Sequence, residues 1–412
     1  MVQSVLGSLL LGYRPLWSRA RSLAGIQLYV QNAGVAEVDI GHLLRTVHEL
    51  WTASSPPLLL SPLSRQLLCD MLEHAPRGTP WIEVRSDWLG DSAVHSRVKA
   101  AWQRGLKLVW RGPLSRLPEP DTARCFDNSL LSLTPEEAVA ALKAGVPGSR
   151  AGAVSPIIDG QMYEGIPSRA LMQHCLDQHR ALALAGWPTD DLLHQMRHQP
   201  MQPSHHAIAA LMKAIDQEQS IDSFEDLLAE DPLLAYRFLL YTNSAAVGLR
   251  TGIDTLRRGL VMMGYGQLQR WLSDQRPFAS TEPDLEPVRQ ALVIRARLTS
   301  HLLNAGIEHE LRREVYLCGL FSQLYLLMRE PMGTCLHRIP LSQRIYDAIV
   351  LHSGPYSPAL EMACALETDD ASAIRSLCET HELDREEVNR ALLRVLSDLE
   401  VRRPAPSAVA AR

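Results

Sequence analysis

The spacing of apolar residues changes once along this chain of 412 residues, and that change restricts its fold more than any other feature. Up to about residue 190, short apolar runs alternate with segments of helical periodicity. Strands are predicted at 5–11, 25–30, 57–60, 81–84, 106–110 and 182–185. Helices are predicted at 40–51, 64–74 and 92–104, with another beginning at Pro135. Such alternation indicates β/α units around a mostly parallel sheet.

The second half of the chain has a helical pattern throughout. The stretch 198–204 contains two prolines and no apolar period, so it is predicted to contain the linker. Asp231 and Pro232 then mark a helix start, with Asp as the N-cap and Pro at the first helical position. The predicted order is a β/α domain at 1–198, a linker at 199–204, a helical domain at 205–399 and a disordered tail at 400–412.

Charge and cysteine usage restrict the class of protein. A net charge of −5 spreads no large positive field, which argues against nucleic acid as a partner. The seven cysteines are odd in number and form no C-x-x-C pair, which argues against disulfides or a zinc site and favours a reducing cytoplasm. No apolar stretch reaches the roughly 18 residues of a membrane span, so no membrane partner is predicted.

Common catalytic motifs are absent from the sequence. It contains no phosphate-binding G-x-x-x-x-G-K-S/T, no H-E-x-x-H and no G-x-S-x-G. His194 and His198 share a helical spacing, but no third and fourth ligand accompany them at a fixed distance. A solvated linker region is the favoured interpretation of this pair. The sequence therefore predicts no catalytic residue, no metal and no cofactor.

The segment 231–249 resembles the signature of HDOD domains. The resemblance lies in the spacing of Asp231, Pro232, Arg237, Asn243 and Ser244. Later segments also fit in order, at 253–264, 268–271, 318–324 and 339–342. The resemblance covers about residues 200–395. It implies an all-helical relative of the HD metal-phosphohydrolases without their metal ligands, and the chain has no His-Asp dipeptide.

Two of these signature residues are polar and adjacent, and they allow two interpretations. Asn243 and Ser244 follow an apolar helix, where both side chains can bond nearby backbone and Asn tolerates a left-handed conformation. A helix end and turn is therefore the favoured interpretation. A ligand site at these two residues is the alternative.

The first half resembles, more faintly, an EAL domain, the (β/α)-barrel that hydrolyses cyclic di-GMP. The opening segments 12–16 and 25–29 look like the start of EAL domains fused to HDOD domains, and 81–84, 105–109 and 185–188 match later barrel segments. The expected fold class is thus a degenerate, shortened EAL-like barrel, with some strands or helices missing, followed by an all-helical HDOD domain.

The positions that would hold metals in an EAL barrel have mostly changed. EAL catalysis implies divalent metals bound by carboxylates at several strand ends. In the register of the resemblance, the candidate barrel-site residues are Gln27, Glu83, Arg111, Gln161 and Glu164, and a further glutamine is replaced by Ala185. Only Glu83 and Glu164 keep an acid, while Arg111 brings a positive charge to a position where a cation should bind.

Two functions follow from this comparison. The favoured one is a non-catalytic bacterial regulatory protein that binds protein partners of a signalling pathway. The alternative is a cyclic di-GMP receptor or a weak cyclic di-GMP phosphodiesterase. For the favoured function, Tyr265, Trp271 and Phe278 are candidate interaction residues beside two arginines, although Trp271 fits a core position better.

Overall fold

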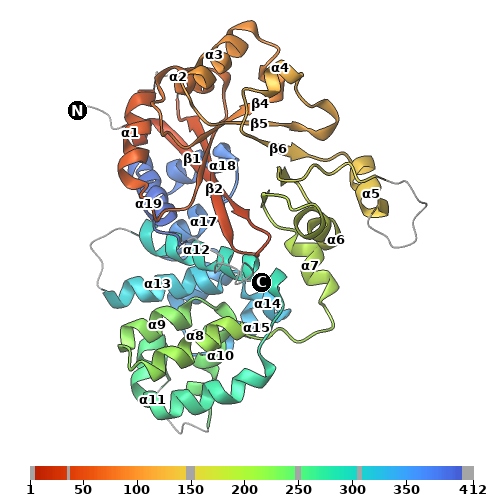
Figure 1. Ribbon diagram of the computed structural model, residues 1–412. Helices are drawn as coiled ribbons and strands as arrows, with labels where there is room; N and C mark the ends of the chain where they lie inside the picture. Colours follow the sequence, from red (N-terminus) through yellow and green to blue (C-terminus); the bar gives the residue numbers. More distant parts are fainter. Residues whose placement is uncertain (1–4, 35–37, 145–153, 246–251, 304–308, 401–412) are drawn as a thin grey trace. The chain divides into compact units, whose positions relative to one another are not determined.

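The computed structural model describes residues 5–34, 38–144, 154–245, 252–303 and 309–400 (Figure 1). The chain divides into two compact units. The barrel unit comprises Met1–Leu192 together with Ala365–Arg412, and the helical unit comprises Leu193–Cys364. Among the described residues, no helix combines the length and apolar character that a bilayer span requires.

The barrel unit is built on a closed β-barrel. Its strands are β1 (Leu9–Trp17), β2 (Leu23–Asn32), β3 (Leu58–Pro62), β4 (Trp81–Arg85), β5 (Leu108–Pro113), β6 (Asn128–Ser132), β7 (Met162–Glu164) and β8 (Ala183–Ala185). β1 runs antiparallel to both of its neighbours, β2 and β8. The other neighbouring strands pair in parallel, as the alternation of strands and helices predicted.

The barrel fold class is confirmed, but the expected loss of strands is not found, because eight strands close the ring within the part of the chain that the structure describes. The strand predicted at 5–11 is confirmed from Leu9, where β1 begins, whereas 5–8 form a short 3₁₀ helix. The strands that the sequence did not predict are β6 and β7. β7 is three residues long, and β6 carries only Leu130 and Leu131 as apolar residues. Strands this short or this polar leave too weak an alternation to identify.

Helices follow most of the parallel strands. They are α1 (Ile40–Leu50), α2 (Arg65–His74), α3 (Ser92–Gln103), α4 (Pro120–Ala123), α5 (Pro135–Ala144), α6 (Arg169–Gln173) and α7 (Thr189–Gln195). The first three begin at side-chain caps, Asp39, Ser64 and Asp91, which each accept a bond from a backbone N–H of the first turn. Inside the barrel, Leu16, Leu59, Val109, Leu130 and Met162 form a buried apolar core.

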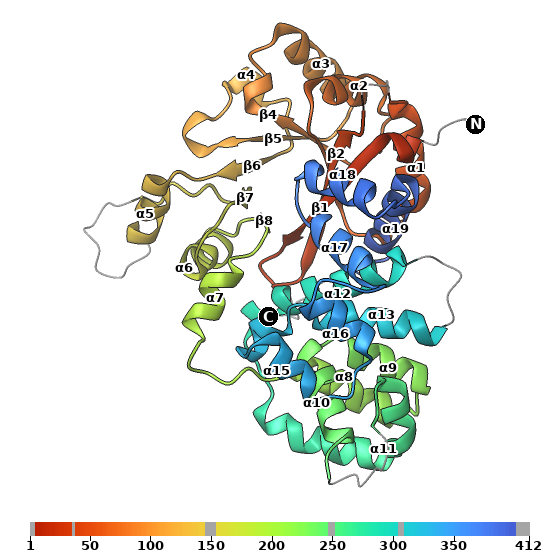
Figure 2. The same ribbon diagram turned by 180° about the vertical axis from the view of Figure 1, so that it is seen from behind.

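Two helices from the C-terminal part of the chain belong to the barrel unit. α18 (Ala371–Thr380) and α19 (Arg385–Ser397) lie beside β1 in both views (Figures 1 and 2). The buried Asn389 of α19 donates from Nδ2 to the carbonyl oxygens of Leu6 at 2.7 Å and Leu9 at 2.9 Å. The N–H of Tyr13 donates to the carbonyl oxygen of Leu366 at 2.7 Å.

This arrangement differs from the predicted helical domain at 205–399. Amphipathic periodicity reveals that a helix has a buried face, but it does not reveal which surface that face covers. The predicted disordered tail lies outside the described residues except for Glu400.

The helical unit is formed by ten helices within the described residues. They are α8 (His205–Asp216), α9 (Ile221–Ala229), α10 (Pro232–Thr242), α11 (Leu256–Gln275), α12 (Glu286–Leu302), α13 (His309–Phe321), α14 (Leu324–Met328), α15 (Met332–His337), α16 (Gln343–Val350) and α17 (Ser357–Ala365). Asp231 is the N-cap of α10 with Pro232 at its first position, as predicted. α11 is interrupted at Gly264, whose φ of 67° lies in the left-handed region that favours glycine.

We predict that Asn389→Ala destabilises the barrel unit by about 2–3 kcal/mol, because two buried carbonyl groups lose their donor. Urea unfolding followed by tryptophan fluorescence measures this, since Trp17 and Trp110 are buried in the barrel unit. Arg390→Ala is the matched control on the same helix. It removes only an exposed pair with Glu386 and should cost under about 0.5 kcal/mol. Equal losses in both variants would contradict the proposed anchoring by Asn389.

Candidate functional site

Polar side chains from five strands, four of them consecutive in the barrel, meet inside one end of the barrel. Gln27 comes from β2, Ser61 from β3, Glu83 from β4, Arg111 from β5 and Glu164 from β7. Because these strands are parallel, residues near their carboxyl ends converge on the same mouth of the barrel, which is where barrel enzymes place their active sites. We call these five residues, with Arg14 of β1 and Tyr29 of β2, the mouth cluster.

The buried carboxylate of Glu83 lies at the centre of the mouth cluster. Its Oε2 accepts hydrogen bonds from Ser61 Oγ at 2.6 Å and from Gln27 Nε2 at 2.8 Å. Its Oε1 accepts one from Arg111 Nη1 at 3.0 Å. Both oxygens of this carboxylate are therefore engaged by side chains of the same chain, and its charge faces a guanidinium.

Arg111 also binds a second carboxylate. Its Nε and Nη2 each donate over 2.8 Å to the two oxygens of Glu164, a bidentate geometry that fixes both planar groups. Arg14 adds a weaker contact, with Nη1 at 3.4 Å from Glu164 Oε2. Burial alone would lower the pKa of Arg111, but the charge of Glu83 and the hydrogen bond and charge of Glu164 raise it above its ordinary value.

Tyr29 orients the amide of Gln27. The Tyr29 hydroxyl donates to Gln27 Oε1 at 3.1 Å, so the amide nitrogen is directed toward Ser61 and Glu83. The Arg14 guanidinium lies 5.4 Å from the centre of the Tyr29 ring. Burial raises the pKa of Tyr29, which keeps this hydroxyl protonated as a donor.

The charges of the mouth cluster balance without an added ion. Two carboxylates, Glu83 and Glu164, face two guanidiniums, Arg111 and Arg14. A divalent metal would need carboxylate oxygens that are free to bind it, and here those oxygens accept hydrogen bonds from protein donors. Across the described ranges, no group of three or more His, Cys, Asp or Glu side chains is arranged to hold a metal ion.

The structure brings together four of the five barrel-site candidates, Gln27, Glu83, Arg111 and Glu164. Gln161 does not join them. It precedes β7, whereas Glu164 ends that strand, and its Oε1 accepts a bond from the N–H of Ser129 near the start of β6 at 2.7 Å. Within β7 it is thus Glu164, three residues further on, that reaches the mouth.

Sequence reasoning missed Arg14, Ser61 and Tyr29 as members of the site. A signal existed for each of them: Arg14 and Tyr29 lie in the two segments that carry the barrel resemblance, and Ser61 directly follows a predicted strand. None of the three is an acid, so a search for metal ligands passes over them.

The signature residues of the helical unit act mainly on backbone groups. Asp231 Oδ1 caps α10 by accepting from the N–H of Leu234 at 2.9 Å, and its Oδ2 accepts from the N–H of Ser204 at 2.7 Å. Arg237 donates to the carbonyl oxygen of Met201 at 3.0 Å and lies 3.3 Å from Gln275 Oε1. Pro232 is buried at the first position of α10.

Asn243 and Ser244 end α10. Asn243 Nδ2 donates to the carbonyl oxygens of Leu239 at 2.7 Å and Ile253 at 2.8 Å, while its Oδ1 accepts from the N–H of Ile253 at 2.7 Å. Ser244 Oγ donates to the carbonyl oxygen of Tyr241 at 2.7 Å. Each polar atom of the Asn243 amide thus bonds to backbone, which is the geometry expected of a helix end and turn.

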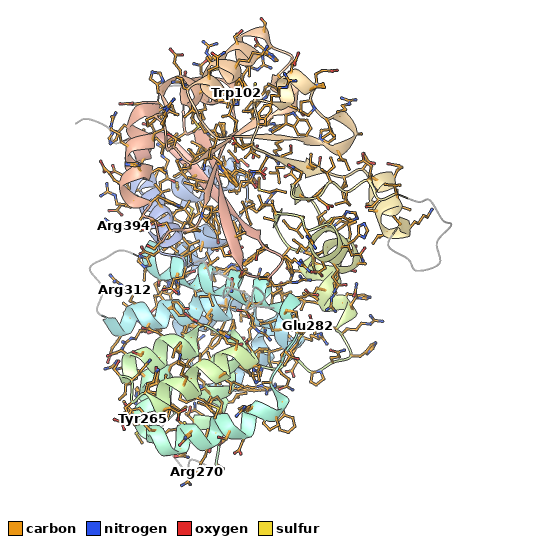
Figure 3. The ribbon with its side chains drawn as sticks, viewed as in Figure 1. Trp102, Tyr265, Arg270, Glu282, Arg312 and Arg394 are labelled. Atoms are coloured by element: carbon orange, nitrogen blue, oxygen red, sulfur yellow. The ribbon has the colours of Figure 1, made fainter. Side chains whose placement is uncertain are left out.

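The three aromatic candidates have different surroundings. Trp271 is buried against Phe238, with ring centres 5.5 Å apart, and so occupies a core position. Tyr265 is 47% exposed, and its hydroxyl donates to the carbonyl oxygen of Gln219. Phe278 is 66% exposed. Tyr265 and Arg270 both project from α11 (Figure 3).

A protein-family model for the HDOD domain matches residues 201–329. The chain contains an HDOD domain. The matched HDOD region includes the helices from α8 to α14 and all eight signature and interaction candidates, and it begins inside the predicted linker. The resemblance noted from the signature spacing is thereby confirmed, and the region N-terminal to the matched residues contains the eight-stranded barrel.

Two curated proteins are similar to parts of the chain. The uncharacterized protein YuxH of Bacillus subtilis is 23% identical over 190 residues, covering 45% of this chain and 46% of YuxH. The cyclic di-GMP phosphodiesterase CdgJ of Vibrio cholerae is 22% identical over 202 residues, covering 46% of this chain and 44% of CdgJ. The chain thus matches less than half the length of either relative.

Two solved structures are similar to parts of the chain. The MmoQ response regulator from Methylococcus capsulatus is 14% identical over 47% of this chain and 97% of its own, with a TM-score of 0.37. The EAL domain of FimX from Xanthomonas citri, in complex with c-di-GMP, is 13% identical over 44% of this chain and 87% of its own, with a TM-score of 0.28. Similarity at this level carries no conclusion about what the chain binds.

We predict that Arg111→Met destabilises the protein by about 3–5 kcal/mol, because it leaves the buried Glu83 carboxylate without its cation. Adding Glu83→Gln should recover part of this loss, since the double variant buries no unpaired charge at that position. Arg85→Met is the matched control from the neighbouring strand, because Arg85 pairs with Asp87 in an exposed position. Chemical unfolding of the four proteins measures the effect. A double variant no more stable than Arg111→Met would contradict the central role of this ion pair.

Proposed function

We propose that this protein is a non-catalytic regulatory protein of cyclic di-GMP-related signalling that acts through protein–protein interaction and needs no cofactor. The observation that carries the proposal is the guanidinium of Arg111, which bridges the carboxylates of Glu83 and Glu164 at the barrel mouth. Two features of this chain support the proposal, namely the altered residues of the barrel mouth and the HDOD domain.

The position of Arg111 opposes metal-dependent hydrolysis on electrostatic grounds. Divalent metals in phosphodiesterases polarise the phosphate and generate a nucleophilic hydroxide from bound water. A metal bound to Glu83 and Glu164 would lie close to the Arg111 charge. At about 4 Å and an effective dielectric constant near 20, each pair of like unit charges costs on the order of 4 kcal/mol. Gln27 supplies a neutral amide in place of another anionic ligand.

The link to cyclic di-GMP signalling rests on the family relations. The barrel segments resemble EAL domains, the HDOD model matches the helical unit, and the relative CdgJ is named as a cyclic di-GMP phosphodiesterase. The activity in the name of CdgJ is not assigned to this chain, because the similarity is partial and distant. For this chain we infer that the signalling context persists while hydrolysis has been lost.

The helical unit is the better candidate for the output of the signal. Its signature is intact in sequence, and its exposed aromatic side chains offer anchors for a protein partner. Tyr265 and Phe278 flank a stretch of α11 and the following turn that also carries the exposed Arg270 and Arg276. Partner surfaces combine such aromatic and arginine residues more often than other parts of a protein surface.

We predict no hydrolysis of cyclic di-GMP by the full chain with either magnesium or manganese. Product formation above a buffer control, measured by chromatography and abolished by Glu83→Ala, would contradict the proposal and favour a weak phosphodiesterase. Calorimetric titration of cyclic di-GMP into the same preparation tests the receptor alternative. Heat that saturates at a defined stoichiometry without turnover would make the chain a receptor.

We predict that Tyr265→Ala combined with Phe278→Ala weakens partner binding by at least about tenfold, as expected for the loss of aromatic anchors. The measurement is quantitative co-purification from the native host with a folded double variant, verified by circular dichroism. Trp102→Ala is the matched control, because Trp102 is 45% exposed but belongs to α3 of the barrel unit (Figure 3). Retention of every partner by the double variant would exclude this segment as the interface.

A further inference from the structure

The segment 199–204, which was predicted to be a linker, belongs to the helical unit and is hydrogen-bonded to other elements of that unit along most of its length. We call it the strap. Three guanidinium groups donate to its carbonyl oxygens: Arg329 to Gln199 at 3.0 Å, Arg237 to Met201 at 3.0 Å and Arg289 to Gln202 at 2.9 Å. These arginines come from α10, α12 and the residue after α14, so separate elements converge on one short stretch of backbone.

The end of the strap is fixed by backbone bonds. The N–H of Ser204 donates to Asp231 Oδ2, and the N–H of His205 donates to the carbonyl oxygen of Ser280 at 2.9 Å. The N–H of Ser280 in turn donates to the carbonyl oxygen of Pro203 at 2.8 Å. Asp231 therefore both caps α10 and holds the strap. The Nε of Arg289 lies 3.4 Å from Asp231 Oδ2.

The closed position of the strap carries identifiable costs. Arg237 and Arg329 use charged donors on neutral carbonyl groups, and burial lowers the pKa of both side chains, with Asp231 opposing that effect on Arg237. Among the described residues, no donor reaches the buried Oε1 of Gln202. A buried acceptor without a donor is unfavourable, and it regains water when the segment opens. Favourable and unfavourable contacts thus oppose each other within a few residues.

The composition of the strap suits a segment that opens as one piece. Pro200 and Pro203 have no N–H, so the backbone cannot extend α8 backward, and strand-like pairing is confined to one isolated bridge between Ser204 and Ser280. The contacts that hold it come from side chains and from Ser280. Withdrawing those donors therefore does not require any helix of the unit to unwind.

We propose that the strap is a conformational switch, which opens as a unit while the helices that hold it stay folded. A regulatory protein needs an element with two arrangements whose balance a partner can bias. The strap is covalently continuous with α7 on one side and α8 on the other, so its release frees the chain between them. Opening of the strap is independent of whether the barrel hydrolyses a nucleotide.

Hydrogen exchange on the full chain tests the proposal. The reporters are the amides of Ser204 and His205, which donate to Asp231 and Ser280, and the amide of Gln199, which donates to the carbonyl oxygen of Met196 just before the strap. In Arg237→Gln combined with Arg329→Gln, we expect these amides to exchange about tenfold faster, the change expected when a charge-assisted hydrogen bond is lost. Amides inside α10 and α12 should keep their wild-type rates. Arg270→Gln, an exposed arginine of α11, is the matched control and should leave all rates unchanged.

Two results would overturn the switch. One is an unchanged exchange rate at the three reporters in the double variant. The other is a wild-type strap whose exchange rises with added denaturant in parallel with the core of α10 and α12, because the strap would then open only by global unfolding. If the double variant fails to fold, Arg329→Gln alone should accelerate exchange at Gln199 and leave His205 unchanged, and no change at Gln199 would equally overturn the proposal.

Discussion

The contact of Arg111 with both Glu83 and Glu164 fixes the arrangement of the polar side chains at the mouth of the barrel. One guanidinium joins β4, β5 and β7 across the mouth of the barrel, and the remaining oxygen of Glu83 organises Gln27 and Ser61. A buried ion pair adds little net stability compared with apolar residues, because desolvation offsets the attraction. Its effect is instead to specify one arrangement of side chains, since each carboxylate becomes costly as soon as the cation moves away.

The sequence predicts those strands and helices that leave a local periodic pattern of apolar residues. The parallel strands β2, β3, β4 and β5 and the helices α1, α2 and α3 appear in the sequence as alternating apolar runs and amphipathic segments. The short strands β6 and β7 do not, because closure of a barrel is a non-local condition that two or three apolar residues satisfy without a visible pattern. The site shows the same limit, since the candidates Gln161 and Glu164 are three residues apart in sequence but lie at opposite ends of β7.

In the helical half, the chemistry of individual residues was predictable and their partners were not. Asp231 and Pro232 identify the start of α10, and Asn243 identifies its end, because capping depends on neighbours in the sequence. Arg237 carries no local clue that its acceptor is the carbonyl of Met201, on the other side of two helices in sequence. The segment 199–204 therefore reads as a linker from its prolines and polar residues, although in three dimensions it is among the more tightly bonded stretches of the helical unit.

The packing of α19 on the barrel has a consequence for the order in which the chain folds during synthesis. The helical unit lies within the sequence of the barrel unit, between β8 and α18, so the barrel cannot complete its packing until the ribosome has made Asn389. The helical unit is rich in local contacts and can fold first, as a domain that emerges complete. Until then the outer side of β1 is exposed with its partner still unmade. During that interval the uncovered surface of β1 is open to aggregation, and this exposure ends when α18 and α19 pack against the strand.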